Sequence, residues 1–264
     1  MKSKPARGEA HPRTVDSKNK PGKMRLDVLI VERGLAPSRQ RAQALLLAGQ
    51  VRVDGARMDK AGSQIAADAR VEIAGEALRY SSRGGLKLEG ALENFGVSAQ
   101  GKICLDIGSS TGGFTDCLLQ HGARRVYAVD VTTNQLDWKL QQDQRVVMIE
   151  RNARYLQPAD IGEAVELVVM DVSFISVAKV LPAVVAASAA ECEFLILIKP
   201  QFELEKRNVG KGGIVRDPAL HQKAIGGVLW AAAQAGLEAK SAGPSRLLGT
   251  QGNQEFFLHA RRRG

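Results

Sequence analysis

Apolar positions near the start of the chain recur at helical spacing and then at strand spacing. Leu26, Leu29 and Ile30 lie on one face of a helix, and a second helix is expected over 39–48, capped by Ser38 and ended by Gly49. Short strands are expected at 51–53, before the Asp54-Gly55 turn, and at 71–73. Residues 25–81 are therefore predicted to form a small α+β domain.

From residue 82 onward, strand and helix patterns alternate. A helix is expected over 84–96, and helical stretches such as 113–121 and 217–235 separate short apolar runs. The predicted strands are 102–106, 125–130, 145–149, 166–171, 194–199, 238–246 and 254–260. This alternation predicts an α/β domain with a doubly wound, Rossmann-like sheet over 82–264. The short glycine-containing loop between the last two strands indicates an antiparallel hairpin.

Charge is distributed unevenly between these parts. Residues 1–85 carry 17 Lys and Arg against 9 Asp and Glu, whereas residues 86–264 carry 20 against 19. A basic module joined to a nearly neutral domain indicates nucleic-acid binding, although a solvated basic surface is the alternative. Residues 1–24 are polar and basic with few large apolar groups, so we expect a disordered basic tail there.

The composition also narrows the compartment and the kind of site. No secretory signal is visible, and charged residues and a proline interrupt the most apolar stretch, 177–198, so no membrane span is expected. The three cysteines and four histidines form no metal-spaced cluster, so no metal site is expected. An odd cysteine count without a C-x-x-C pair favours a reducing, cytoplasmic location.

A glycine-rich segment carries the sharpest local signal. It follows the strand 102–106 and opens a helix, where glycines let the backbone approach a ligand closely. Its spacing differs from the G-x-G-x-x-G of dinucleotide-binding loops, and Asp106 could accept from an ammonium group such as that of S-adenosylmethionine. A structural turn is the alternative. The candidate cofactor-binding residues here are Asp106, Gly108, Ser109, Ser110, Gly112, Gly113 and Phe114.

Two polar residues at later strand ends could complete a nucleoside site. Asp130 ends the second predicted strand, where a carboxylate can accept both ribose hydroxyls of a cofactor, as it also does in nicotinamide enzymes. Asn152 follows the third strand and could bond an adenine edge, or it could be a turn residue. Asp171, after the fourth strand, is a further cofactor-site candidate.

Four charged residues could meet at the same sheet edge. Asp171 and Lys199 follow apolar strands, Glu255 lies in the last strand, and Lys87 lies on the helix before the sheet. A lysine at the end of a buried strand is unusual, because a buried ammonium requires partners. Each of these residues alone could form a surface salt bridge, but together at strand ends they predict a catalytic cleft.

Six segments of the chain resemble the TlyA family, once called hemolysins. The catalytic half of that family resembles FtsJ-type ribose methyltransferases. The matching segments are Ser82–Leu88, Asp106–Phe114, Met170–Ser176, Ile198–Glu203, Gly210–Asp217 and Gly252–Glu255. Residues 25–80 are similar to an S-four-type RNA-binding domain. The resemblance implies S-adenosylmethionine-dependent 2'-O-methylation of a cytidine ribose in 16S or 23S rRNA. It also implies that the family's catalytic Lys-Asp-Lys-Glu tetrad falls on Lys87, Asp171, Lys199 and Glu255.

Within such a site, Lys199 is the candidate base for the ribose hydroxyl, and Asp171 and Glu255 would hold the two amines. The RNA-binding candidates are Arg39, Arg41, Arg52 and Arg83, whose guanidinium groups could contact phosphates of ribosomal RNA or ribosomal subunits. Three alternatives stay open at this point. They are a non-catalytic RNA-binding assembly factor, a membrane-active hemolysin without a suitable apolar segment, and a nicotinamide oxidoreductase without the usual glycine spacing.

Overall fold

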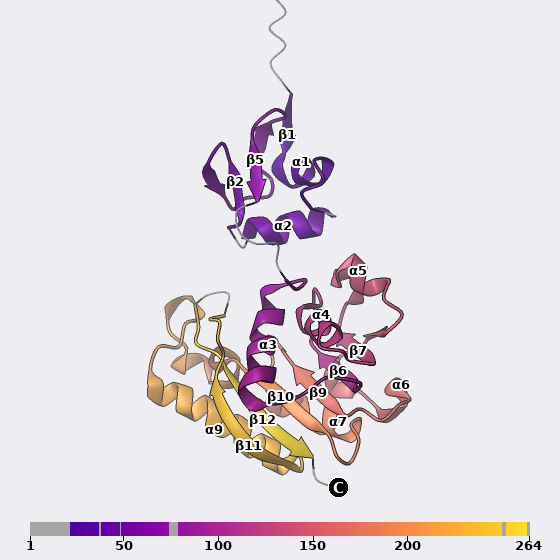
Figure 1. The fold of residues 1–264 in the computed structure, drawn as a ribbon. Helices are drawn as coiled ribbons and strands as arrows, with labels where there is room; N and C mark the ends of the chain where they lie inside the picture. The colour runs from indigo at the N-terminus through magenta and orange to yellow at the C-terminus, as the bar shows by residue number, and fades with distance from the viewer. Residues whose placement is uncertain (1–21, 37, 48, 74–78, 250–251, 263–264) are drawn as a thin grey trace, which may run out of the picture. The chain divides into compact units, whose positions relative to one another are not determined.

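The chain folds into two compact units, Met1–Gly75 and Glu76–Gly264, in a computed structural model (Figure 1). The structure describes residues 22–36, 38–47, 49–73, 79–249 and 252–262. The predicted tail lies outside these ranges up to residue 21. Its last residues do not follow the prediction, because Lys23 and Met24 belong to a strand that pairs with Ala66 and Ile65.

The described residues of the first unit form two helices and two small antiparallel sheets. The helices are α1 (Leu26–Glu32) and α2 (Arg39–Leu47). Strand β1 (Lys23–Arg25) pairs with β4 (Gln64–Ala66), while β2 (Val51–Val53) lies between β3 (Ala56–Met58) and β5 (Val71–Ile73). Asp54 and Gly55 connect β2 to β3 with φ values of 49° and 82°, which is the geometry of a tight hairpin turn.

Apolar residues at the predicted helical spacing form the core of this unit. Leu26, Leu29 and Ile30 of α1 are buried, and they pack with Leu46 of α2 and Val51 of β2. Ser38 caps α2 by accepting from the amide of Arg41 at 3.2 Å, as the sequence predicts.

The second unit is built on a seven-stranded sheet with the order β11-β12-β10-β9-β6-β7-β8. Strands β6 to β10 are parallel, and β12 runs antiparallel to both of its neighbours, which confirms the predicted hairpin. The ends of all seven strands lie within two residues of the prediction. The strands are β6 (Ile103–Ile107), β7 (Arg125–Asp130), β8 (Val146–Glu150), β9 (Leu167–Met170), β10 (Glu193–Ile198), β11 (Leu237–Pro244) and β12 (Phe256–Arg262).

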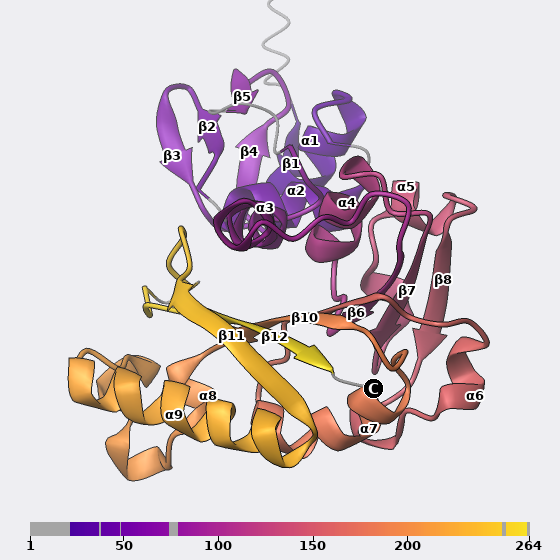
Figure 2. The same ribbon diagram turned by 60° about the horizontal axis from the view of Figure 1, so that its bottom comes forward.

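Helices cover both faces of this sheet, as expected for a doubly wound fold (Figure 2). The α-helices are α3 (Arg83–Phe95), α4 (Gly113–Gln120), α5 (Trp138–Gln141), α6 (Pro158–Ile161), α7 (Leu181–Ala186), α8 (Pro200–Glu203) and α9 (Pro218–Gln234). Short 3-10 turns connect other elements: η1 (Thr133–Gln135), η2 (Ala153–Tyr155), η3 (Val177–Lys179), η4 (Lys206–Asn208) and η5 (Lys211–Gly213).

Successive residues of a strand point to opposite faces, so the sheet separates two apolar clusters. Ile103 and Leu105 of β6 pack in a cluster with Val184 of α7 and Val228 of α9. Cys104, which lies between them in sequence, packs in the other cluster, whose members include Leu88 of α3 and Leu118 of α4. All three cysteines are free and buried, in keeping with a role as small core residues.

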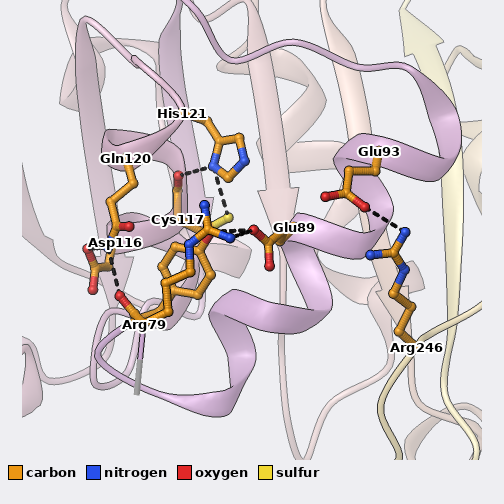
Figure 3. Close-up of polar contacts among 9 residues, drawn as sticks. Arg79, Glu89, Glu93, Asp116, Cys117, Gln120, His121 and Arg246 are labelled. Carbon is orange, nitrogen blue, oxygen red and sulfur yellow. Dashed lines mark hydrogen bonds and ion pairs between the residues drawn. The ribbon is translucent and has the colours of Figure 1, made fainter. Parts of the chain in front are cut away.

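The chain is attached to the second unit before the predicted start at residue 82. Tyr80 is buried, and its hydroxyl donates to Glu89 Oε1 at 3.0 Å, while the Ser81 amide donates to Asp116 Oδ2 at 2.7 Å. Gln120 of α4 donates to the carbonyl of Arg79 at 2.9 Å, and Arg79 forms an ion pair with Glu89 (Figure 3). These contacts place residues 79–81 with α3 and α4 of the second unit.

Candidate active site

The carboxyl ends of the parallel strands meet at one edge of the sheet, where doubly wound folds bind their ligands. The glycine-rich segment leaves β6 there and enters α4, Asp130 ends β7, Asp171 directly follows β9, and Lys199 follows β10. Residues far apart in the sequence are thus brought to one edge by the strand order alone.

Asp106 lies within β6 and is completely buried. Its Oδ2 accepts from the hydroxyl of Thr115 at 2.6 Å, and burial raises the pKa of its carboxyl to about 7. Its Oδ1 is buried and has no hydrogen-bond partner among the described residues. A buried carboxylate oxygen without a donor is a place for a cationic ligand group, provided that the group can reach it.

Two glycines of this segment are required by close approaches. Gly108 has φ of 85°, and a side-chain Cβ there would lie 2.6 Å from the carbonyl oxygen of Asp171. A Cβ at Gly113 would lie 2.1 Å from Ser82 Oγ and 3.0 Å from the amide nitrogen of Gly85, because the starts of α4 and α3 are in contact. Gly113 therefore serves helix packing, whereas Gly108 lets β6 and β9 end side by side.

The remaining members of the segment differ in exposure. Ser110 is exposed, with φ of 47°, whereas Ser109 is buried and Gly112 caps the start of α4. Phe114 was predicted to bind cofactor, but it is a core residue whose ring stacks on Phe257 at 6.2 Å between centroids.

Asp130 braces the glycine-rich segment. One carboxylate oxygen accepts from the amide of Ser110 at 2.9 Å, and the other accepts from the amide of Thr132 at 3.4 Å. The residue is half-buried at the end of β7 and is followed by Val131, which is 61% exposed. Asp130 therefore connects the loop that follows β6 with the loop that follows β7.

Asn152 has the structural role that the sequence left open. It is exposed, and its Oδ1 caps η2 by accepting from the amide of Arg154 at 3.1 Å. Its side-chain NH2 group is not used in that cap, so a second contact through this donor is compatible with the structure.

Lys199 forms the first of two ion pairs in the candidate tetrad. Its Nζ lies 2.5 Å from Asp171 Oδ1 and donates to Ser173 Oγ at 2.7 Å. The same amine lies 5.9 Å from the ring centroid of Phe202. Lys199 is thus oriented by two neighbours from the β9 loop, and Ser173 is one that the sequence reasoning did not single out.

Lys87 and Glu255 form the second pair. Lys87 Nζ donates to Glu255 Oε2 at 2.5 Å across 168 positions of sequence, and both side chains are almost completely buried. Gly249 leaves room for this carboxylate, since a Cβ at Gly249 would lie 2.3 Å from Glu255 Oε1. All four tetrad residues are therefore paired, one lysine with one carboxylate each.

A pocket of about 380 Å³ joins the two pairs. Lys199 and Glu255 both line it, together with Ser173, Phe174, Gln201, Phe202, Val209 and Gly213. Phe174 is 91% exposed and has φ of 64°, a conformation that bulky residues rarely adopt. The pocket therefore offers an amine, a carboxylate and two aromatic rings to a ligand of nucleotide size.

Glu203 connects the two loops that flank the pocket. Its carboxylate accepts from Ser176 Oγ at 2.6 Å and from the amide of Val177 at 2.9 Å. Burial raises the pKa of Glu203. Because Glu203 ends α8 and Ser176 ends the loop that carries Asp171 and Ser173, this contact fixes the spacing of the lysine and its partners. No local sequence pattern identifies such a residue.

The arginines predicted to bind RNA have different surroundings. Arg39 donates to Asp27 Oδ2 at 3.0 Å, and Arg25 and Gln43 share the same carboxylate. These donors lower the pKa of the buried Asp27 well below its usual range. Arg52 is exposed and donates to the carbonyl of Gly55 at 3.0 Å, Arg41 is half-buried on α2, and Arg83 is exposed at the start of α3.

The described part of the chain contains no helix that is both long and apolar enough to cross a membrane. It also contains no group of three or more His, Cys, Asp or Glu residues arranged to hold a metal ion.

Comparison with known families divides the chain in the same two parts. A family model described as FtsJ-like methyltransferase matches residues 80–262, and one described as S4 domain matches residues 24–71. The first match covers well over half of the chain and includes the whole pocket and both ion pairs.

Individual relatives match nearly the full length. YqxC of Bacillus subtilis, named as an rRNA methyltransferase, is 49% identical over 239 residues, which are 90% of this chain and 85% of the relative. A Mycobacterium tuberculosis protein named 16S/23S rRNA (cytidine-2'-O)-methyltransferase TlyA is 45% identical, over 90% of this chain and 89% of its own. A solved structure from Streptococcus thermophilus, named as a hemolysin, is 43% identical with a TM-score of 0.72 and covers 92% of this chain and 89% of its own.

Proposed function

Because the chain belongs to the TlyA family of FtsJ-like methyltransferases, we propose that it methylates the ribose 2'-oxygen of a cytidine in 16S or 23S rRNA. The observation that carries the proposal is the position of Lys199 on the pocket wall, fixed by Asp171 and Ser173. A primary amine held by a carboxylate and a hydroxyl can receive the proton of a hydroxyl that enters the same pocket. The reaction takes place in the cytoplasm, where its substrate is assembled.

The residues at the sheet edge fit S-adenosylmethionine. The unpartnered Oδ1 of Asp106 would accept from the ammonium group of the cofactor. Asp130 would accept its ribose hydroxyls, and the NH2 group of Asn152 would bond its adenine. Gly108, Ser109, Ser110 and Gly112 supply a backbone without bulky side chains between these groups.

When bound, the cofactor supplies a methyl group on a positively charged sulfur; the sulfur keeps the electrons of the broken sulfur–methyl bond and so becomes a neutral thioether. The ribose oxygen forms the new bond to the methyl carbon, and Lys199 accepts the proton that this oxygen gives up. Asp171 and Ser173 keep the amine in line with the hydroxyl, and such positioning can supply much of the acceleration.

The S4 domain would contribute affinity for RNA. Arg41, Arg52 and the exposed part of Arg39 would contact phosphates, which orients the substrate without reading its sequence. Arg83 begins α3 one turn before Lys87, so it would contact the RNA next to the reacting nucleotide.

The test is transfer of tritiated methyl groups to isolated 30S and 50S subunits from cells that lack the enzyme. We expect incorporation at one ribose, resistant to alkaline hydrolysis because a methylated 2'-oxygen cannot attack the neighbouring phosphate. The Lys199→Ala variant, run in parallel, is expected to bind cofactor and to transfer methyl groups far more slowly than the wild type. Binding of RNA without transfer to either subunit by the wild type would instead favour a non-catalytic assembly factor.

A further inference from the structure

The chain between α8 and α9 contains a concentrated group of basic residues. Residues 206–216 include Lys206, Arg207, Lys211 and Arg216 and contain no acidic residue. All four side chains are exposed. Arg207 forms an ion pair with Glu205 at 2.7 Å, whereas no ion pair involves the other three within the described residues. We refer to residues 206–216 as the basic rim segment.

This concentration is unusual for its domain. Residues 86–264 carry 20 Lys and Arg against 19 Asp and Glu, and without the basic rim segment they carry 16 against 19. The remainder of the domain is thus slightly acidic and would repel a polyanion. An RNA that approaches the pocket meets favourable charge where the basic rim segment lies.

The basic rim segment also forms part of the pocket wall. Val209 and Gly213 line the pocket that contains Lys199 and Glu255. Lys206, Lys211 and Arg216 lie within three residues of these two wall residues along the chain. Because three residues span at most about 11 Å, the backbone of each of these basic residues lies within that distance of the pocket wall.

One buried side chain holds the segment in this place. Asn253 is 1% exposed, and its Oδ1 accepts from the amide of Val215 at 2.8 Å. Its Nδ2 donates to the carbonyl of Gly213 at 2.8 Å. Asn253 lies two residues before Glu255, so the same short stretch positions the carboxylate and the basic rim segment. His221 adds a contact between its Nε2 and the carbonyl of Val215 at 2.9 Å.

We propose that the basic rim segment is a second RNA-binding element, which binds backbone phosphates beside the nucleotide that enters the pocket, and that Asn253 positions it. The inference rests on the proposed function, because it assigns the phosphate contacts of that same substrate. The basic rim segment would attract RNA electrostatically within the methyltransferase domain, in addition to the attraction expected from the S4 domain. Phosphate contacts of this kind increase affinity in a salt-dependent way.

The test compares two triple variants of the full chain with equal net charge. The first is Lys206→Ala, Lys211→Ala and Arg216→Ala. The control is Arg124→Ala, Lys240→Ala and Arg261→Ala, which removes one basic residue just before β7, one from β11 and one from β12, toward the end of the sheet opposite the carboxyl ends of the parallel strands. Binding to the ribosomal subunit that the wild type methylates is measured over a range of salt concentrations, with methyl transfer recorded on the same samples.

For the first variant, we expect the slope of log affinity against log salt to become shallower by about two, because three phosphate contacts are lost. Between 50 and 200 mM salt, the wild type should then lose roughly 15-fold more affinity than the variant does. The KM for the RNA should rise, while the rate at saturating RNA stays near that of the wild type. The control variant is expected to keep the slope of the wild type to within about half of that change.

Equal slopes for the two triple variants, with methyl transfer by the wild type intact, would overturn this inference and leave the proposed function standing. Failure of the wild type to methylate either subunit would count against the proposed function instead.

An Asn253→Asp variant tests the positioning role separately. It keeps every basic residue and the side-chain shape but turns the donor to Gly213 into an acceptor. We expect RNA affinity to fall by more than the control variant shows, with circular dichroism unchanged. Affinity equal to that of the wild type would remove Asn253 from the proposal.

Discussion

The two lysine–carboxylate pairs of the site have the same chemistry and the same 2.5 Å separation but different surroundings. In the pair of Lys87 and Glu255, the side chains are 10% and 3% exposed. In the pair of Lys199 and Asp171, they are 11% and 22% exposed, and Ser173 and the ring of Phe202 lie beside the amine. Each pair contributes one residue to the pocket wall, but only the second pair has a partner, Asp171, that is appreciably exposed to solvent.

This difference assigns the two pairs different tasks. An enclosed ion pair contributes little net stability, but removal of one partner leaves an uncompensated buried charge and is strongly destabilising. A pair that borders solvent can lose a partner at a smaller cost, because water compensates the remaining charge. We therefore expect Lys87 and Glu255 to support the pocket, Lys199 to act on the substrate, and Asp171 to position Lys199.

The largest expected effect separates the two tasks directly. Lys199→Ala should lower the single-turnover rate of methyl transfer by about 1,000-fold, within the range for loss of a general base. Its free energy of unfolding should change by about 1 kcal/mol or less. Lys223→Ala, which removes an exposed lysine on α9, is the matched control and should leave both quantities unchanged. Near-normal turnover by Lys199→Ala would contradict the assignment of different tasks to the two ion pairs.

The next effect concerns stability. Glu255→Gln leaves Lys87 buried without its carboxylate and should lower the free energy of unfolding by about 3 kcal/mol. Asp171→Asn should lower it by about 1 kcal/mol. Urea midpoints at constant slope measure both changes. Replacement of both residues of the enclosed pair, by Lys87→Met and Glu255→Leu in one protein, should recover most of the free energy of unfolding that Glu255→Gln loses. Equal destabilisation by the two single variants would contradict the comparison.

A smaller effect concerns the cofactor side of the edge. Burial raises the pKa of Asp106 to about 7, so its carboxyl becomes ionised only as the pH rises through that value. Because a cofactor ammonium requires the ionised form, affinity for S-adenosylmethionine should be roughly tenfold weaker at pH 6 than at pH 8. Isothermal titration measures this dependence, and Asp106→Asn should remove it.

Ionisation of Asp106 should strengthen cofactor binding but lower the stability of the cofactor-free protein. The pKa of Asp106 is higher in the folded protein than its ordinary value of 3.8, so the folded state binds the proton more tightly. The free energy of unfolding of the cofactor-free protein should therefore fall as the pH rises from about 4 to about 7. Asp106→Asn should flatten this part of the profile, and an unchanged profile would show that the carboxyl is ionised throughout.

The smallest expected effect is that of Ser173→Ala. Loss of one hydrogen bond to the Lys199 amine corresponds to about 1 kcal/mol and therefore to a roughly fivefold lower rate. Affinity for the cofactor should not change, because Ser173 contacts Lys199. Ser98→Ala, at an exposed serine after α3, is the control in the same transfer assay. A loss as large as that of Lys199→Ala would mean that Ser173 itself handles the proton.

The central strands of the large sheet could be predicted closely because they are buried on both faces. Runs such as Phe194–Ile198 are continuously apolar, and the chain between them has helical periodicity, so each boundary is marked in the sequence. Strands β1 and β4 have only three residues each and little burial, so no pattern marks them. The start of the second unit was also predicted too late, because the contacts of Tyr80 and Ser81 are with residues far along the chain.

For the site, the sequence indicated which residue types gather at the strand ends but not how they pair. Lys87 could have faced Asp171 as readily as Glu255, and only the packing of α3 against β12 decides the partner. Neither the Asn253 amide bonds nor the positive φ of Phe174 has a local signature, since both depend on loops from separate parts of the chain. Such long-range contacts follow from tertiary structure, which no local pattern encodes.

The most direct test of the central claim, that Lys199 accepts the ribose proton, is the single-turnover rate of methyl transfer by Lys199→Arg. An arginine keeps the positive charge beside Asp171 but does not give up its proton in proteins, so it cannot act as a base. We expect the rate to fall by at least about 100-fold while the affinity for the cofactor stays unchanged. A rate within a few-fold of the wild type would contradict it, because charge and position at residue 199 would then suffice.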